Sequence, residues 1–202
     1  MVSATLEIPP PLPRSIVFDP PLTDEEFERL SGSCDFASLE RTKEGAILVN
    51  APAGHSTGDG NSEINHQLRT WWKKHRRGKV TDSSAGFFLR DGSSLSADAA
   101  YVTAEQLAGT SLKDRSQFLH VPPAFVIELR SPSDSLPRCA EKMKGWIANG
   151  VQLGLLVDPQ TRQVHICEPG ASPRVETGSS VAESGPVEGF VLDLEEVWRC
   201  YE

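Results

Sequence analysis

The clearest pattern of hydrophobic and polar positions lies at residues 125–130, which read Phe-Val-Ile-Glu-Leu-Arg. Proline-containing turns at 121–123 and 131–133 enclose this short apolar run. Such a run is typical of a buried strand. Because side chains alternate along a strand, we expect the odd-numbered residues to share one face and the even-numbered residues, including Glu128 and Arg130, to share the other.

Apolar residues at helical spacing predict three helices. Thr23 is a good N-cap for a short first helix, with Glu26 at the capping-box position. Residues 61–75 predict an amphipathic helix that Gly78 stops. A third helix is expected from about Ser135. Its apolar face comprises Leu136, Cys139, Ala140, Met143, Trp146 and Ile147.

The other apolar segments predict strands joined by turns. Residues 40–42 and 46–49 flank a turn and predict a hairpin, and residues 153–157 and 163–167 predict a second hairpin. Further expectations are strands at 86–90 and 99–102, a loop at 51–60 and a Gly/Ser-rich excursion at 169–186.

The order of these elements predicts an α/β (α+β) fold with a mixed sheet flanked by helices, preceded by an N-terminal helix and hairpin. Six prolines in residues 1–21 predict an extended arm. Residues 22–202 are long enough to form a single domain with a sizeable core.

Composition narrows the class of protein. The chain has no run of ~18 apolar residues, so we expect no membrane-spanning helix. At the N-terminus no basic region precedes an apolar one, so we expect no secretory signal. The four cysteines are scattered without a C-x-x-C pair, which favours reduced thiols and a cytoplasmic location.

The formal net charge of −8 argues against a protein that coats nucleic acid nonspecifically, but it does not exclude local contact. Residues 73–79 hold five of the twenty Lys and Arg residues. This run has two interpretations, a solvated helix end whose cations complement the helix dipole or a phosphate-binding site.

Two carboxylates attract attention because they occur close to predicted neighbouring strands. Asp98 directly precedes one strand, and Glu128 lies within the central one. Such a pair can hold a hard divalent cation, and a Lys or Arg can stabilise charge that develops on a phosphate. Lys142 and Lys144 flank the apolar face of the third helix, and spacing alone does not choose between them. The alternative is a structural ion pair of Glu128 with Arg130 or another base.

Four motifs in the chain resemble those of the Uma2 family of endonucleases. They are Ser96–Val102, Val126–Asp134, Glu141–Val151 and Val157–Arg162. The similarity runs from about Leu22 to Trp198. It implies a restriction-endonuclease-like fold of the PD-(D/E)xK type and a metal-dependent phosphodiesterase site.

The resemblance also implies roles for particular residues. Asp98 matches the aspartate of the motif and Glu128 the acidic residue that follows it. Lys142 matches the lysine, which in this family comes from the next helix. Glu63 is the implied acidic residue of the first long helix and a further metal ligand. The implied cofactor is Mg²⁺ or Mn²⁺, and the implied substrate is DNA.

Three departures from the family pattern qualify this interpretation. Ala97 stands where a proline is usual, Asn61 stands where a histidine is frequent, and Arg130 is unusual at its position. The second departure weakens the argument for a role of Asn61, and Arg130 can substitute for or compete with Lys142. The alternative function is a catalytically silent nucleic-acid- or protein-binding domain. We also expect a homodimer, because cutting both strands requires two active sites.

Overall fold

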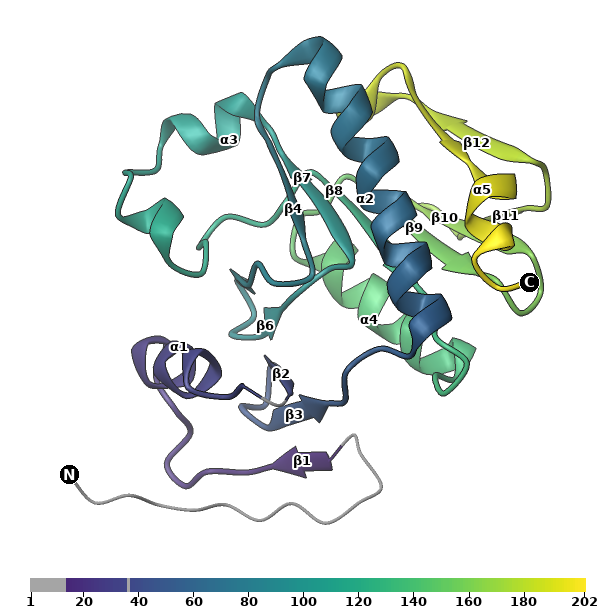
Figure 1. The fold of residues 1–202 in the computed structure, drawn as a ribbon. Coiled ribbons are helices and arrows are strands. Elements are labelled where there is room, and N and C mark those ends of the chain that lie inside the picture. Colours follow the sequence, from purple (N-terminus) through teal and green to yellow (C-terminus); the bar gives the residue numbers. More distant parts are fainter. Residues whose placement is uncertain (1–13, 36) are drawn as a thin grey trace.

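The computed structural model of the protein describes residues 14–35 and 37–202, and its centre is a six-stranded mixed sheet (Figure 1). The strand order is β11-β10-β9-β8-β7-β4. Strands β8 and β9 are parallel, and the other neighbouring pairs are antiparallel. The strands are β4 (Lys79–Asp82), β7 (Ala99–Val102), β8 (Phe125–Leu129), β9 (Leu153–Asp158), β10 (Gln163–Cys167) and β11 (Arg174–Glu176).

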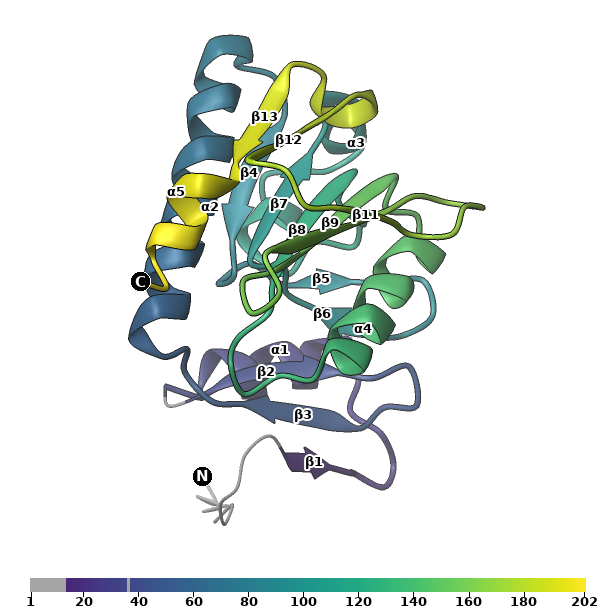
Figure 2. The ribbon, with the colours of Figure 1, turned by 90° about the vertical axis from the view of Figure 1, so that its right-hand side faces the viewer.

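Strand β8 is buried along its whole length between β7 and β9. Its two faces differ as predicted, since Val126 packs in the core under helix α4 (Leu136–Ala148), whereas the odd-numbered residues pack in the core under helix α2 (His55–His75). Those residues are Phe125, Ile127 and Leu129. Figure 2 shows α2 and α4 on opposite sides of the sheet.

Helix α4 confirms the third predicted helix. Its N-cap is Ser135 and its C-cap is Asn149. Met143 and Trp146 are fully buried against the sheet. Because α4 connects β8 to the parallel strand β9, its first turns follow the carboxyl end of β8, where Glu128 lies.

Helix α2 begins earlier than the sequence predicts. The loop expected at 51–60 is wrong in its second half, because the helix starts at His55. Gly60 lies within this extra length. A Cβ atom there would come within 2.9 Å of Cδ2 of Leu129, so glycine allows the close approach of α2 to β8 without displacement of that side chain. Close packing thus outweighs the low helix propensity of glycine.

A five-stranded sheet of order β1-β3-β2-β6-β5 forms the N-terminal side of the molecule. Its strands are β1 (Arg14–Ile16), β2 (Ser38–Arg41), β3 (Ile47–Asn50), β5 (Phe87–Phe88) and β6 (Ser94–Leu95). The antiparallel pair β2–β3 confirms the first predicted hairpin. Helix α1 (Asp24–Gly32) starts at the predicted N-cap Thr23, with its capping box to Glu26. Residues 1–13 of the predicted arm lie outside the described residues.

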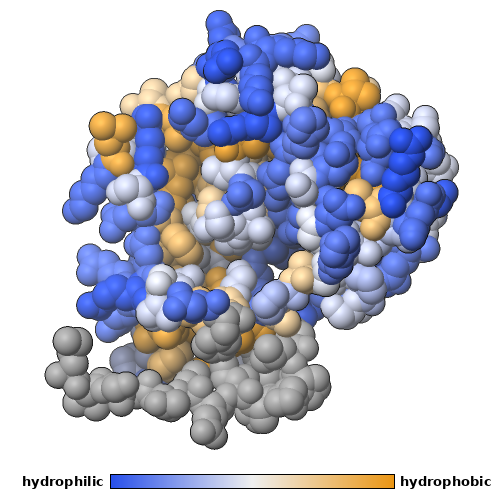
Figure 3. All heavy atoms as spheres, viewed as in Figure 1, coloured by the Kyte–Doolittle hydropathy of each residue, from blue (hydrophilic) through white to orange (hydrophobic). Residues whose placement is uncertain are grey.

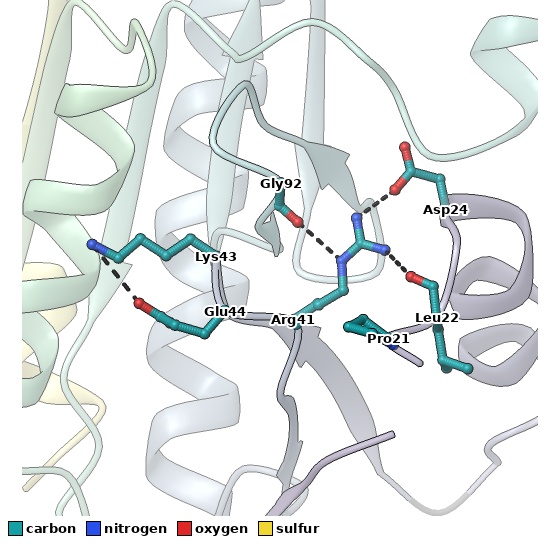
Figure 4. A pocket seen from close by; sticks show the side chains of 8 residues that line it. Pro21, Leu22, Asp24, Arg41, Lys43, Glu44 and Gly92 are labelled. Atoms are coloured by element: carbon teal, nitrogen blue, oxygen red, sulfur yellow. Dashed lines mark hydrogen bonds and ion pairs between the residues drawn. The ribbon is translucent and has the colours of Figure 1, made fainter. Parts of the chain in front are cut away.

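Arg41 on β2 connects the start of helix α1 to this sheet through hydrogen bonds and an ion pair (Figure 4). Its guanidinium donates hydrogen bonds to the backbone oxygens of Gly92 (3.0 Å) and Leu22 (3.1 Å) and pairs with Asp24. It also lies over the ring of Phe27, 5.3 Å from the centroid. The hollow beside it has a volume of about 270 Å³. These contacts serve the packing of the N-terminal segment.

The C-terminal part of the chain completes the face that α2 covers. The remaining elements are α3 (Ala104–Ala108), η1 (Asp114–Ser116), β12 (Ser180–Glu183), η2 (Gly185–Val187), β13 (Phe190–Asp193) and α5 (Leu194–Arg199). The predicted excursion at 169–186 contains β11 and β12, which the sequence analysis did not predict. The strand pair β9–β10 confirms the second hairpin. In the described part of the chain, no helix has the length and apolar character needed to cross a membrane.

Candidate active site

Three of the residues singled out by the sequence gather at one end of the central sheet. Ala99 pairs with Ile127 in the antiparallel register of β7 and β8, so Asp98 lies beside Glu128. Oδ2 of Asp98 accepts a hydrogen bond of 2.7 Å from the backbone N–H of Leu129. Nζ of Lys142, on α4, lies 3.0 Å from Oε2 of Glu128. Two strands and one helix therefore bring Asp98, Glu128 and Lys142 together.

Glu128 is almost completely buried, with 7% of its surface exposed. Its Oε1 accepts a hydrogen bond of 2.7 Å from Nε1 of Trp146, a residue predicted only as part of an apolar face. Burial raises the pKa of Glu128 to about 8; Lys142 opposes this rise, whereas the carboxylates of Asp98 and Glu40 add to it. Burial thus favours the protonated form of Glu128, against the pairing with Lys142.

Lys142 lies among three carboxylates and remains charged. Its Nζ is 2.9 Å from Oε1 of Glu40 and donates a hydrogen bond of 2.8 Å to the backbone oxygen of Ser96. Burial by itself lowers the pKa of Lys142, but Glu128, Glu40 and Asp98 together outweigh it and raise the pKa above its ordinary value. Lys142 is consequently a fixed cation rather than a proton acceptor.

Glu40 is a member of this cluster that the sequence analysis missed. It lies on β2 of the N-terminal sheet, and only 6% of its surface is exposed. Besides Lys142, its Oε1 accepts a hydrogen bond of 3.1 Å from the backbone N–H of Ser96, and its Oε2 accepts one of 3.2 Å from Asn50. The one sequence feature that could have pointed to Glu40 is that it is a carboxylate within a short strand of the predicted hairpin. Nothing in the hairpin pattern indicated which side of the molecule it would face.

Two asparagines of α2 hold the segment that carries Asp98. Nδ2 of Asn61 donates to Oδ1 of Asp98 at 3.1 Å, and Nδ2 of Asn65 donates to its backbone oxygen at 2.8 Å. Burial raises the pKa of Asp98, against the opposing effects of Lys142, the N–H of Leu129 and Asn61. The departure from the family pattern weakened the argument for a role of Asn61, yet this side chain contacts the candidate site directly.

The residues present fit a hard divalent cation. Oδ1 of Asn61 is buried and has no hydrogen-bond partner among the described residues, so an unmet oxygen acceptor lies beside Asp98. Within residues 14–35 and 37–202, no three His, Cys, Asp or Glu side chains form a metal-binding group. An ion here would use the carboxylates of Asp98 and Glu128 and the amide oxygen of Asn61, with water in its other positions, as Mg²⁺ commonly retains.

Glu63 lies on a different side of α2 from the candidate site. At ~100° per residue, it is about 200° around the helix from Asn61. Its Oε1 accepts a hydrogen bond of 2.9 Å from Gln67, which also contacts the backbone of Asp193 in the C-terminal segment. The structure therefore does not bring Glu63 together with Asp98 and Glu128.

Arg130 and Lys144, the other cations considered, have partners elsewhere. Nη1 of Arg130 lies 2.8 Å from Oδ2 of the fully buried Asp158. Of the bases considered for a structural ion pair with Glu128, Arg130 or another base, the structure pairs Glu128 with another base, Lys142. Lys144 pairs with Glu141 on the exposed face of α4.

The raised pKa of Glu128 predicts a pH dependence of the metal-free protein. A carboxyl group whose pKa is higher in the folded state stabilises the fold below its unfolded-state pKa and loses this contribution as pH rises through about 8. In EDTA, the melting temperature should therefore decrease as the pH is raised from 5 to 8. The decrease should be about 2–4 °C for each kcal/mol lost from the free energy of unfolding. Glu128→Gln should flatten this slope; an unchanged slope would assign the pH dependence to other groups.

Comparisons with known proteins bear on the family and the fold. The sequence model of the Uma2 family, described as "Putative restriction endonuclease", matches residues 24–195. No curated protein matches the chain. A crystal structure described as a putative nuclease belonging to DUF820, from Anabaena variabilis ATCC 29413, has 18% identity and a TM-score of 0.73 over 90% of this chain and 100% of that chain. At this identity the similarity shows the fold, which is restriction-endonuclease-like, and the family match shows that the chain belongs to the Uma2 family.

Proposed function

We propose that this chain is a Mg²⁺- or Mn²⁺-dependent endonuclease that hydrolyses phosphodiester bonds of DNA. The observation that carries the proposal is the meeting of Asp98, Glu128 and Lys142, from three separate elements, beside the unmet acceptor of Asn61. Family membership supports the same reaction class.

The charges of the cluster suit a divalent cation. Glu40, Asp98 and Glu128, when ionised, and the ammonium of Lys142 leave a local charge of −2, which one divalent ion balances. Asp98 and Glu128 would hold the ion with the amide oxygen of Asn61. When bound, such an ion supplies positive charge that polarises the phosphate and lowers the pKa of an attacking water.

The protein side chains then orient and stabilise the reacting phosphate. In hydrolysis, the water oxygen bonds to phosphorus, the bond from phosphorus to the leaving sugar oxygen breaks, and a proton ends on that oxygen. Lys142 would donate an N–H bond to the negative charge that develops on the phosphate. Glu40 and the backbone oxygen of Ser96 hold the ammonium in place, so only its bond to Glu128 would have to be exchanged for one to the phosphate.

The test of the proposal is incubation of the chain with supercoiled plasmid and with single-stranded DNA, in Mg²⁺, Mn²⁺ or Ca²⁺ and in EDTA. We expect nicked or linear products with Mg²⁺ or Mn²⁺ and none in EDTA. A parallel preparation of Asp98→Asn excludes a contaminating nuclease. Intact DNA of both kinds in every metal would overturn the proposal.

The second candidate function is a catalytically silent nucleic-acid- or protein-binding domain. It is favoured by the closed hydrogen-bond network of the cluster, in which each oxygen of Glu128 accepts a bond and the ammonium of Lys142 has three acceptors. Calorimetry with Mn²⁺ separates the two functions. Heat of binding that Asp98→Asn abolishes supports the enzyme, and the absence of binding supports the silent domain.

Assembly is part of the proposal. A single-domain enzyme that cuts both strands of a duplex needs two active sites, and two-fold dimers are the commonest soluble oligomers. We therefore expect light scattering at micromolar concentration to give about twice the chain mass of 22.0 kDa. A mass equal to one chain would count against the dimer.

A further inference from the structure

A strongly basic surface lies at the opposite end of α2 from the candidate active site. We call it the α2 basic patch. Its exposed side chains are Arg69, Lys73, Lys74, Arg76, Arg77 and Lys79. Among residues 14–35 and 37–202, none of these six forms an ion pair with a carboxylate. Figure 3 shows the end of the molecule where α2 stops, at the top, as strongly hydrophilic.

A half-buried indole organises the centre of the patch. The cations of Arg69, Arg76 and Lys79 lie 4.7, 5.6 and 5.9 Å from the ring of Trp72. Nε1 of Trp72 donates a hydrogen bond of 3.0 Å to the backbone oxygen of Gly78, which fixes the indole against the turn after the helix. Cation–π contacts thus hold charges from a helix, a turn and a strand around one ring.

The turn beneath the patch is tightly constrained. Helix α2 ends at His75, the last residue of the predicted helix, and Arg76 adopts the left-handed conformation with φ 57°. Gly78 has φ +63°, and a Cβ atom there would lie 2.2 Å from the backbone oxygen of Val102. This turn is therefore packed directly on β7. A preformed arrangement of cations loses little conformational entropy when an anion binds.

Neighbouring acids and the helix dipole do not account for the patch. Arg69 contributes to the lowered pKa of Asp82, and Arg77 to that of Glu105, so two carboxylates lie near six cations. The dipole favours cations in the last turn of a helix. It does not explain Arg69, which precedes that turn, or Lys79, which lies on β4. In a chain of net charge −8, this concentration of positive charge fits a polyanion.

We propose that the α2 basic patch binds the phosphate backbone of the same DNA duplex that enters the candidate active site, an inference that rests on the proposed function. Asn61 and Asn65, which hold Asp98, lie on the same helix as the patch. At ~1.5 Å per residue, Trp72 is about 16 Å from Asn61 along the helix axis. This corresponds to about five base pairs of duplex, so one segment of DNA can contact both places.

The test is duplex binding by a charge-reversal pair, Arg69→Glu with Arg76→Glu. Anisotropy of a fluorescent duplex of about 30 base pairs, in EDTA between about 50 and 200 mM salt, gives affinity and its salt dependence. We expect binding weakened about tenfold or more and a log–log salt slope about two units shallower. The control pair, Arg29→Glu with Lys113→Glu, changes two exposed cations outside the patch and should leave both quantities unchanged.

Single-turnover cleavage at saturating protein separates this inference from the proposed function. The patch variant should retain the wild-type rate within about threefold, because it loses binding and not transition-state contacts. Cleavage by the wild type, with duplex binding that the patch variant leaves unchanged, would overturn the patch and keep the enzyme. Absence of cleavage by the wild type, with patch-dependent duplex binding, would overturn the enzyme and keep the patch as a DNA-binding surface.

Discussion

Replacement of Asp98 by asparagine is expected to lower the single-turnover rate of DNA cleavage by about 10³-fold or more. The reason is the loss of a charged oxygen ligand, since a catalytic metal supplies several kcal/mol of stabilisation to the transition state and each ~1.4 kcal/mol is tenfold in rate. The fold should persist, because an asparagine oxygen still accepts the N–H bond of Leu129. Mn²⁺ calorimetry and a thermal melt complete the measurement.

The matched control is Glu63→Gln. Glu63 was implied as a further metal ligand, but its carboxylate bonds to Gln67 on another side of α2. We expect the cleavage rate of this variant to stay within about twofold of the wild-type rate, because the substitution is remote from the reacting phosphate. A loss equal to that of Asp98→Asn would return Glu63 to the site. Asp98→Asn with full cleavage would remove Asp98 from it.

The sequence predicts those parts of the site that depend on local periodicity. Alternation along 125–129 determines which side chains of β8 share a face, and a single residue of slip would reverse both faces. The packing confirms that register, because Phe125, Ile127 and Leu129 lie in the core under α2 and Val126 lies in the core under α4. Helical spacing in α4 likewise places Lys142 at the flank of its apolar face. Because β8 and α4 are consecutive, Glu128 and Lys142 are close in both sequence and space.

The contacts that the sequence could not predict join segments far apart in the chain. Glu40 comes from the N-terminal hairpin, whose pattern defines its own pairing but not the side on which it meets α4. Asn61 reaches Asp98 across the interface where α2 packs closely on β8 through the neighbouring Gly60. Glycine lowers intrinsic helix propensity, so the pattern predicted a loop there, and tertiary packing reversed it.

Replacement of Lys142 by alanine is expected to lower the cleavage rate by about 10²-fold or more, on the scale of losing one transition-state donor. Mn²⁺ affinity should not weaken, because the substitution removes a positive charge from among Glu40, Asp98 and Glu128. The same change leaves Glu40 and Glu128 buried without their cation, which costs stability by about 3–5 kcal/mol. Rates are therefore normalised to the folded fraction measured by circular dichroism.

Three comparison variants separate a catalytic cation from a merely structural one. Lys142→Arg keeps the charge and should recover stability more fully than rate, because a planar guanidinium does not reproduce the point charge of an ammonium. Lys144→Ala, on the exposed face of α4, should leave the rate unchanged. Arg130→Ala should reduce stability through the buried Asp158 while sparing the rate per folded molecule. Full activity in folded Lys142→Ala, together with loss in Arg130→Ala, would transfer the catalytic cation to Arg130.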